Sequence, residues 1–290
     1  AAPTKLKMDL GVDVLPTFSK DSTDRNRTSP FAFTGNKFEF RMLGSSNSIA
    51  CANIMLNAAV AESLRIYADR LEKAENFESA LHDMIQKTIK DHKRIIFNGN
   101  GYDDAWIKEA TEKRGLLNLR TTPDAMPAIL EKKNVDMLTY HRIFSKAEIE
   151  SRYEIMLDNY CKAVNIEALT MIDMARKEIL PAVEAYTKEL AQTLTLKLSA
   201  VPGLGAKYER STIERLSGLA DEIAAATAAL ESATIRLKSA ADVTEESCMI
   251  RDDILQKMAE LRVVCDEAET ITAEEYWPFP TYGQLLFGVR

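Results

Sequence analysis

Glycine and proline, the residues that most often interrupt regular structure, are scarce in long stretches of this 290-residue chain. Neither residue occurs between Gly44 and Gly99, from Ala128 to Leu180, or from Leu219 to Trp277. Strands rarely exceed about ten residues, so uninterrupted stretches of this length are typical of helices. The chain is therefore predicted to be mostly helical.

The sequence also lacks any apolar run of about 18 or more residues, the length that a membrane-spanning helix needs. No basic segment followed by an apolar one occurs near its beginning, so no secretory signal peptide is predicted. The four cysteines, Cys51, Cys161, Cys248 and Cys265, are far apart and have no neighbouring histidine. This spacing fits neither a zinc site nor a disulfide framework. We expect a soluble, cytoplasmic protein with reduced, buried thiols and no membrane partner.

Positive charge is in the minority, with 37 Lys and Arg against 44 Asp and Glu and a formal net charge of -7. Surfaces that bind nucleic acid normally need clustered Lys and Arg, so no nucleic-acid partner is expected. Apolar residues make up 46% of the chain and charged residues 28%, as in ordinary globular proteins. The composition therefore permits a packed core, in one large domain or two.

Amphipathic patterns and capping signals indicate where the helices lie. The expected helices run from about 46–48 to 67, from 76 to 89, and over 103–114, 123–134, 146–198, 212–241 and 243–268. Ser145 with Glu148, and Ser211 with Glu214, are each predicted to form a capping box. Thr122 before Pro123 is another start signal. Pro181 is expected to bend or interrupt the long middle helix.

Large apolar residues recur at every seventh position in the last two expected helices. They are Leu216, Ile223, Leu230 and Leu237, followed by Ile254 and Leu261. This spacing is typical of helices that pack along their length, so residues 212–268 are predicted to form a long antiparallel helical hairpin. The charged residues between them indicate a solvated face or, as an alternative, a surface that binds a partner.

The first 45 residues follow a different pattern. From Lys37 to Met42, charged and apolar residues alternate, which predicts a strand with one charged and one apolar face. A second strand is expected at Leu10 to Leu15. Because so few strands cannot form a stable sheet alone, the rest of the sheet is expected upstream of this chain. The predicted fold class is α+β, mostly α.

Glu39 and Arg41 are predicted to lie on one face of this strand, about 7 Å apart, which is twice the rise per residue. A carboxylate offers hard oxygen atoms to Mg²⁺ or Mn²⁺, and a guanidinium group binds phosphate oxygens in a fork. The loop containing Arg25 and Arg27 adds positive charge to the same end of the strand. A site for a metal-bound phosphate is one interpretation. The alternative is an ordinary ion pair on a solvent-facing strand.

Residues 24–41, which read DRNRTSPFAFTGNKFEFR, resemble the C-terminal part of the catalytic domain of glutamine synthetase in its large class III form. Two more segments carry the same resemblance, residues 96–116 and the YWPFPTY sequence at 276–282. The resemblance covers nearly the whole chain. It implies that residues 1–98 end the catalytic domain and that residues 99–290 form a helical extension, with the long hairpin near 212–268.

The resemblance implies an ATP-dependent glutamate–ammonia ligase that forms glutamine through a γ-glutamyl phosphate. ATP and Mg²⁺ or Mn²⁺ would be the cofactors, glutamate and ammonia the substrates, and a homo-oligomer of stacked rings, a dodecamer, the assembly. Glu39 matches a glutamate that binds the metal. Arg27 matches a loop arginine that contacts nucleotide phosphate, and Arg41 matches an arginine that stabilises the transferring phosphoryl group, so both are expected to be catalytic and to bind the cofactor.

The sequence departs from the family pattern at Ala32, where other classes carry a second loop arginine, so the binding of substrate carboxylate or phosphate at that corner is open. The β-grasp domain and the other metal ligands of the family would lie before Ala1, so we expect this chain to be a fragment that is inactive alone. His82, His92 and His141 have no ligand-like spacing and are expected to be ordinary surface or boundary residues. The alternative function is a non-catalytic helical assembly or interaction module.

Overall fold

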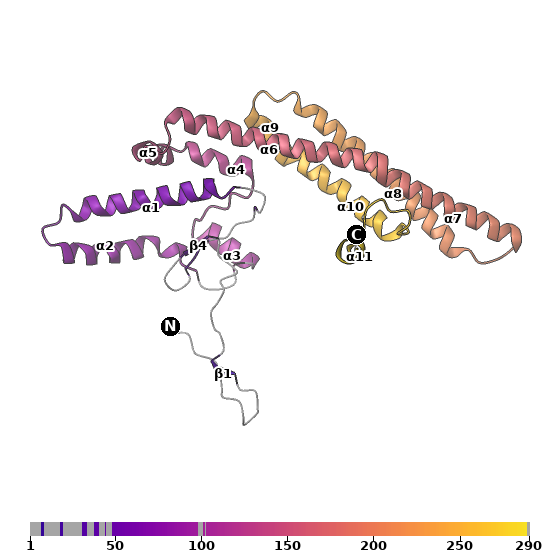
Figure 1. Cartoon of the computed structure of the whole chain (residues 1–290), viewed down its shortest axis with the longest axis horizontal. Coiled ribbons are helices and arrows are strands. Elements are labelled where there is room, and N and C mark those ends of the chain that lie inside the picture. Colours follow the sequence, from indigo (N-terminus) through magenta and orange to yellow (C-terminus); the bar gives the residue numbers. More distant parts are fainter. Residues whose placement is uncertain are drawn as a thin grey trace. The chain divides into compact units, whose positions relative to one another are not determined.

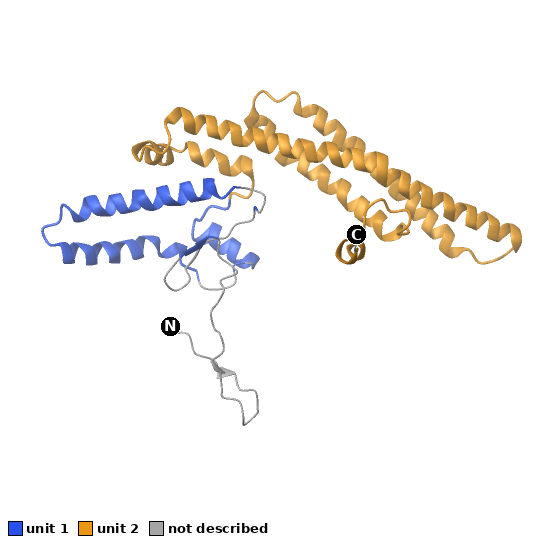
Figure 2. Cartoon of the chain, in the orientation of Figure 1, with its two compact units in different colours: residues 1–118 blue, residues 119–290 orange. Residues whose placement is uncertain are grey.

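The computed structural model describes residues 7–8, 18–19, 31–33, 38–40, 44, 48–97, 101 and 103–288. The chain divides into two compact units, unit 1 with residues 1–118 and unit 2 with residues 119–290, shown in separate colours in Figure 2. Helices dominate both units, in agreement with the predicted mostly helical class. The domain boundary predicted at 98/99 stays a prediction.

Two short antiparallel ladders are described in unit 1. β1 (Lys7–Met8) pairs with β2 (Phe18–Ser19), and β3 (Phe31–Phe33) pairs with β4 (Phe38–Phe40). β4 lies within the stretch from Lys37 to Met42 whose alternation predicts a strand. The other expected strand, Leu10 to Leu15, lies outside the described residues.

Unit 1 continues with two helices, α1 (Ala50–Leu71) and α2 (Phe77–His92), which run side by side in Figure 1. Asn76 caps α2 by accepting a hydrogen bond from the backbone N–H of Ser79, which satisfies one of the free donors of the first turn. Both helices leave large apolar side chains exposed to solvent. These are Ile49, Val60, Leu64, Ile66, Phe77, Ile85 and Ile89.

The rest of unit 1 is held together around Arg114. It comprises a 3₁₀ turn (Lys93–Ile95), α3 (Asp104–Lys108) and a π-helical segment (Glu109–Lys113). The Arg114 guanidinium donates hydrogen bonds to the carbonyl oxygens of Arg94 (3.1 Å) and Ile96 (2.8 Å) and to the Glu109 carboxylate. It also lies 4.9 Å from the centre of the Trp106 ring. One side chain therefore ties the end of the 3₁₀ turn to the end of the π-helix.

The predicted single helix over 123–134 is wrong. Unit 2 begins instead with α4 (Thr122–Ala125), a 3₁₀ segment (Met126–Leu130) and α5 (Lys132–Tyr140). Thr121 is the N-cap of α4, one residue before the expected start signal. Pro127 explains the break, because it has no N–H with which to continue the α-helical hydrogen bonds.

The predicted long middle helix is present as α6 (Lys146–Met174), a π-helical segment (Ala175–Ile179) and α7 (Leu180–Ala200). Its predicted capping box is confirmed: Ser145 accepts from the N–H of Glu148, and the Glu148 carboxylate accepts from the N–H of Ser145 at 2.8 Å. Pro181 is the second residue of α7, and Leu180 alone separates it from the π-helical segment. Proline has no N–H to donate to the preceding turn. The π-helical turn just before it already departs from the α-helical hydrogen-bond spacing, and the helix continues through Pro181 as α7.

Two further helical stretches complete the main body of unit 2: α8 (Lys207–Leu237), and a stretch made of α9 (Val243–Met249), a π-helical segment (Ile250–Ile254) and α10 (Leu255–Ile271). The predicted capping box at Ser211 is wrong, because α8 begins four residues earlier. The Ser211 hydroxyl instead donates to the carbonyl oxygen of Tyr208. Two ion pairs join these stretches, Arg236 with Asp253 and Arg215 with Glu267.

The apolar residues spaced by seven lie in the core of unit 2, as their spacing predicts. All six are buried, in a continuous cluster with side chains from α6 and α7. Buried Glu209 pairs with Lys197 and so links the beginning of α8 to the end of α7. The prediction that the cysteines are buried is right for Cys161 and Cys265 and wrong for Cys51, which is exposed; Cys248 is half-buried and all four are free.

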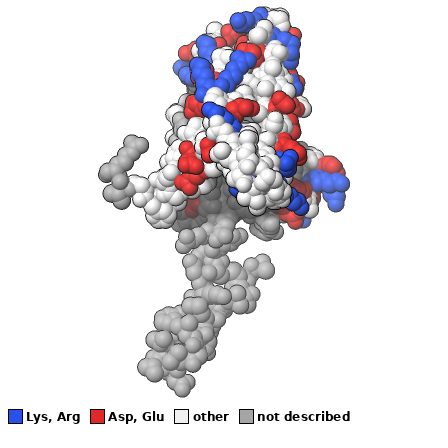
Figure 3. Space-filling view, turned by 90° about the vertical axis from the view of Figure 1, so that its right-hand side faces the viewer, with Lys and Arg blue, Asp and Glu red and all other residues white. Residues whose placement is uncertain are grey.

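The C-terminal segment of unit 2 ends in a short helix, α11 (Tyr282–Phe287). Trp277 and Phe279 precede it, contact each other edge to face and pack against the core cluster. No helix among the described residues has both the length and the hydropathy that a membrane span requires. On the face seen in Figure 3, basic and acidic side chains are interspersed, so that face has no broad patch of one sign.

Candidate functional site

Glu39, the predicted metal ligand, is the central residue of β4. Phe38, which precedes it, is exposed, whereas Glu39 and Phe40 are half-buried. In the ladder with β3, Ala32 is the residue paired with Glu39. Residues that pair across an antiparallel ladder share a face of the sheet, so position 32 stands on the same face as position 39. The structure thus brings the family departure at Ala32 next to the proposed metal ligand.

The two predicted phosphate-binding arginines, Arg27 and Arg41, lie outside the described residues, as does Arg25. Arg41 directly follows β4 in the sequence, so Glu39 is the one predicted site residue whose place in the fold is described. The described residues contain no group of three or more His, Cys, Asp or Glu side chains that could hold a metal ion. A carboxylate such as that of Glu39 can supply one oxygen ligand to Mg²⁺ or Mn²⁺, and one ligand alone does not form a metal site.

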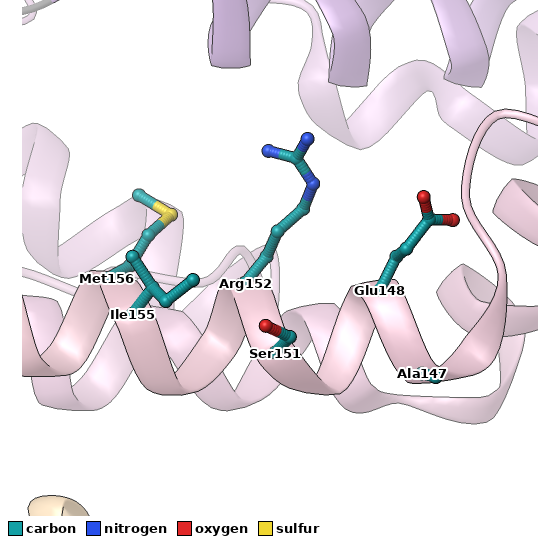
Figure 4. Close-up of a pocket in the computed structure, with 6 residues that line it drawn as sticks. All are labelled: Ala147, Glu148, Ser151, Arg152, Ile155 and Met156. Atoms are coloured by element: carbon teal, nitrogen blue, oxygen red, sulfur yellow. The ribbon is translucent and has the colours of Figure 1, made fainter.

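A surface depression along α6 is a second candidate site (Figure 4). It is lined by Ala147, Glu148, Ser151, Arg152, Ile155 and Met156. Glu148 is already used by its capping box, and the hydrogen bonds from Ser145 lower the pKa of its carboxyl. The Arg152 guanidinium lies 4.2 Å from the centre of the Phe144 ring. These charged groups have structural partners, and the depression shows no catalytic arrangement.

Arg251, in the π-helical segment Ile250–Ile254, joins that segment to α4 beside buried residues of α6. Arg251 donates hydrogen bonds to Asp124 at 2.6 Å and to both carboxylate oxygens of Asp252. The Tyr160 hydroxyl is buried nearby and has no hydrogen-bond partner among the described residues. Burial raises the pKa of Tyr160, and it raises the pKa of the Cys161 thiol to about 11. Both groups are neutral at physiological pH, so this cluster holds elements together and offers no activated nucleophile.

Sequence reasoning overlooked this cluster and the contacts of Arg114. Both depend on arginines whose partners are distant in sequence, as in the Arg251–Asp124 pair, and no short motif brings such residues together. For the contacts of Arg114, the available signal was the pair of aromatic residues Phe97 and Trp106. Their rings stack with centres 3.6 Å apart.

Comparison with known proteins identifies the relatives of this chain. A family model described as the glutamine synthetase C-terminal domain matches residues 80–197. A glutamine synthetase of Butyrivibrio fibrisolvens is 39% identical over 94% of this chain and 39% of its own length. A type-3 glutamine synthetase of Dictyostelium discoideum is 36% identical over 99% of the chain and 40% of its own length.

A glutamine synthetase of Bacteroides fragilis is 32% identical over 98% of the chain and 40% of its own length. The chain therefore spans about 40% of the length of the curated relatives that it matches. These matches confirm the resemblance predicted from residues 24–41, 96–116 and 276–282, including its likeness to the large class.

Proposed function

We propose that this chain, which resembles the C-terminal part of the large-type glutamine synthetases, serves in its complete protein as part of an ATP-dependent glutamate–ammonia ligase. The observation that carries the proposal is Glu39: a half-buried carboxylate at the centre of β4, two residues before Arg41, within the segment that carries the family motif. The proposed assembly is a homo-oligomer of stacked rings in the cytoplasm.

In the proposed reaction, the γ-phosphoryl group of ATP passes to the γ-carboxylate of glutamate, which gives ADP and γ-glutamyl phosphate. Ammonia then attacks the acyl carbon, phosphate leaves, and the extra proton on nitrogen is lost to a base. Arg27 holds the nucleotide phosphates, and Arg41 offsets the negative charge on the transferring phosphoryl group. Glu39 would hold one Mg²⁺ or Mn²⁺, which supplies further positive charge at the phosphates.

Position 32 suggests how this site differs from those of other classes. An arginine there would stand on the same face of the ladder as Glu39, because the two positions are paired. Alanine adds no charge at this point. We therefore propose that the groups binding the substrate carboxylate or phosphate at this corner come from another part of the complete protein.

The chain alone is proposed to be inactive. Of the three residues proposed for the site, one would bind the metal, and a metal needs further ligands that the described residues do not supply together. Assaying the purified 290-residue chain for ATP- and ammonia-dependent glutamine formation tests this point. Turnover by the chain alone would contradict it.

A second candidate function is a non-catalytic assembly module. The seven-residue repeat from Leu216 to Leu261 motivates it, because such repeats usually serve packing and not chemistry; within this chain the repeat packs in the core of unit 2. In the ligase proposal the same helices, proposed as an antiparallel hairpin over 212–268, pack between subunits.

Replacing Glu39 by Gln in the complete protein separates the two functions. This change keeps the shape of the side chain and removes its charge. We expect metal-dependent glutamine formation to fall at least about a hundredfold, because a lost ligand forfeits part of the several kcal/mol that the metal contributes. The native mass of the assembly should not change.

Glu75→Gln is the matched control, because Glu75 is an exposed glutamate of the same unit between α1 and α2. It should leave both activity and assembly unchanged. Full activity of the Glu39→Gln protein would reject the ligase site and favour the assembly module.

A further inference from the structure

The residues that line the depression of α6 form two rows with four-residue spacing. The first row is Glu148, Arg152 and Met156, and the second is Ala147, Ser151 and Ile155. Side chains four residues apart are neighbours on one side of a helix. In Figure 4 the three side chains of the first row rise from the same side of α6. The depression has a volume of about 460 Å³, within the range of small-molecule sites.

The Glu148 carboxylate uses one of its two oxygen atoms in the capping box. Its Oε2 atom accepts from the Ser145 N–H at 2.8 Å and from the Ser145 hydroxyl at 2.9 Å. No residue that the structure describes donates a hydrogen bond to its Oε1 atom. The hydrogen bonds from Ser145 lower the pKa of the carboxyl, so the group keeps its negative charge at neutral pH. One anionic oxygen is therefore available to a positively charged ligand group.

The Arg152 guanidinium group is held by an aromatic ring and has unused N–H groups. It lies 4.2 Å from the centre of the Phe144 ring. Among the described residues it has no hydrogen-bond acceptor and no ion-pair partner. Glu148 would be the usual partner at four-residue spacing, but its carboxylate is turned to Ser145. The stacked guanidinium group thus keeps its forked donors for a ligand, and stacking reduces the entropy that it loses on binding.

The first row runs from a negative to a positive to an apolar side chain. A ligand that matches it carries an ammonium group, a carboxylate and an apolar group close together. An α-amino acid with an apolar side chain has these three groups on one carbon atom. An ion of one sign, by contrast, would be attracted by Arg152 or Glu148 and repelled by the other. Met156 is 39% exposed and Ile155 54%, so both have apolar surface that a ligand can cover.

We propose that the depression of α6 binds a free α-amino acid with an apolar side chain. The Arg152 guanidinium group binds the carboxylate of the amino acid, and the Glu148 Oε1 atom accepts a hydrogen bond from its ammonium group. Met156 and Ile155 contact its side chain. Because the lining residues are exposed, each contact is weak, and we expect an affinity in the millimolar range. The proposal does not depend on the ligase reaction, since the site lies in unit 2 and Glu39 in unit 1.

Three ligands of similar shape test which groups the site requires. L-Leucine carries both charged groups, 4-methylpentanoate lacks the ammonium group, and 3-methylbutylamine lacks the carboxylate. Each is titrated into the 290-residue chain while the amide NMR signals of residues 144–156 are followed. Leucine should shift these signals saturably. It should bind at least about threefold more tightly than either analogue, because each analogue loses one charged contact.

Two variants test the charged groups of the protein. Arg152→Gln should weaken leucine binding at least about fivefold, because the forked contact with the carboxylate is lost. Glu148→Gln removes the negative charge and keeps the capping box, which glutamine also forms. It should weaken leucine binding about threefold and leave the binding of 4-methylpentanoate no weaker. Arg210→Gln is the matched control, because Arg210 is an exposed arginine of α8 outside the depression, and it should bind leucine as the unaltered chain does.

Three outcomes would each overturn the proposal: no saturable shifts with leucine, equal binding of the three ligands, or equal losses in Arg152→Gln and Arg210→Gln. If Arg152→Gln disturbs amide signals far from the depression, Glu148→Gln and the ligand series still decide, because the capping box remains in that variant. These readouts measure binding. A failure here would leave the ligase proposal, which Glu39→Gln tests by activity, intact.

Discussion

The two units bury their apolar side chains to very different extents. In unit 2, leucine and isoleucine from α6 to α10 form one continuous buried cluster. Among the described residues of unit 1, the buried apolar side chains are those of Ala58, Met84 and Ala110. Two of these three are alanines, which contribute little buried area. Unit 2 therefore has a core of its own, whereas the described part of unit 1 buries little apolar area.

This difference indicates which unit would gain more from a further packed layer. A helix pair with exposed isoleucine, leucine and phenylalanine gains stability when a further layer covers it. The proposed upstream sheet of the catalytic domain would provide such a layer for α1 and α2. Unit 2 needs no such cover for its core.

The largest expected effect tests the core of unit 2 directly. Leu230 is fully buried, so Leu230→Ala should lower the free energy of unfolding by about 2–5 kcal/mol through lost burial and the cavity left behind. Urea unfolding followed by the fluorescence of Trp277, with Trp106 replaced by Phe, reports on unit 2. The matched change in unit 1 is Leu64→Ala on α1, where the side chain is 61% exposed.

For this change the fluorescence of Trp106, with Trp277 replaced by Phe, reports on unit 1. Leu64→Ala should change the unfolding free energy by no more than about 0.5 kcal/mol, as for ordinary surface substitutions. Equal losses of unfolding free energy from Leu230→Ala and Leu64→Ala would contradict the conclusion that unit 2 has a buried core and unit 1 does not.

A smaller effect is expected from the polar contacts of unit 1. Arg114→Ala removes the hydrogen bonds to the carbonyls of Arg94 and Ile96 and the contact with Trp106. Charged hydrogen bonds of this kind contribute about 1.5–3 kcal/mol, so backbone amides over 93–97 and 103–116 should exchange their hydrogens at least about tenfold faster. Lys113→Ala, at the exposed neighbouring position, should leave the exchange rates unchanged. Fast exchange in both variants, or in neither, would show that Arg114 does not hold this segment.

The smallest effect concerns the start of α6. Ser145→Ala removes the N-cap hydroxyl and should cost about 1 kcal/mol of unfolding free energy. Ser211→Ala is the control, because Ser211 lies inside α8 and its hydroxyl bonds only within its own turn. Alanine is the better helix former, so this second change should be neutral or slightly stabilising. Thermal unfolding of both variants measures the difference, and a larger loss from Ser211→Ala would reverse the assignment of the caps.

The sequence pattern predicted the long helices of unit 2, α6 to α10, better than the broken stretch at 122–140, because the apolar residues of the long helices share one buried cluster. The spacing of Leu216, Ile223, Leu230 and Leu237 reports this packing directly. Capping signals were less reliable. The Ser-x-x-Glu pattern at 211 is the same as that at 145, yet helix propensity and the ion pair of Glu209 with Lys197 extend α8 past it. A local motif fails where a longer-range contact outweighs it.

The candidate site was predicted mainly through resemblance. Alternation at 37–42 predicted the strand and the position of Glu39 on it, but a single carboxylate does not define a metal site. The pairing of Ala32 with Glu39 depends on the register of the β3–β4 ladder, which sequence spacing alone does not fix. The carboxylate of Glu39 suggested a metal-bound phosphate as the type of site. The proposed ligase reaction came only from the resemblance of residues 24–41 to glutamine synthetase.

Wider helical turns have a consequence for comparing this chain with its relatives. A π-helical turn holds one residue more than an α-helical turn, and each residue rotates the side chains that follow by about 100°. The segment Ala175–Ile179 therefore sets which side of α7, with Val183 and Leu190, meets the core. A relative that lacks one residue here would carry α7 rotated about its own axis. A one-residue gap at this point in an alignment would thus indicate that α7 presents a different side to the core.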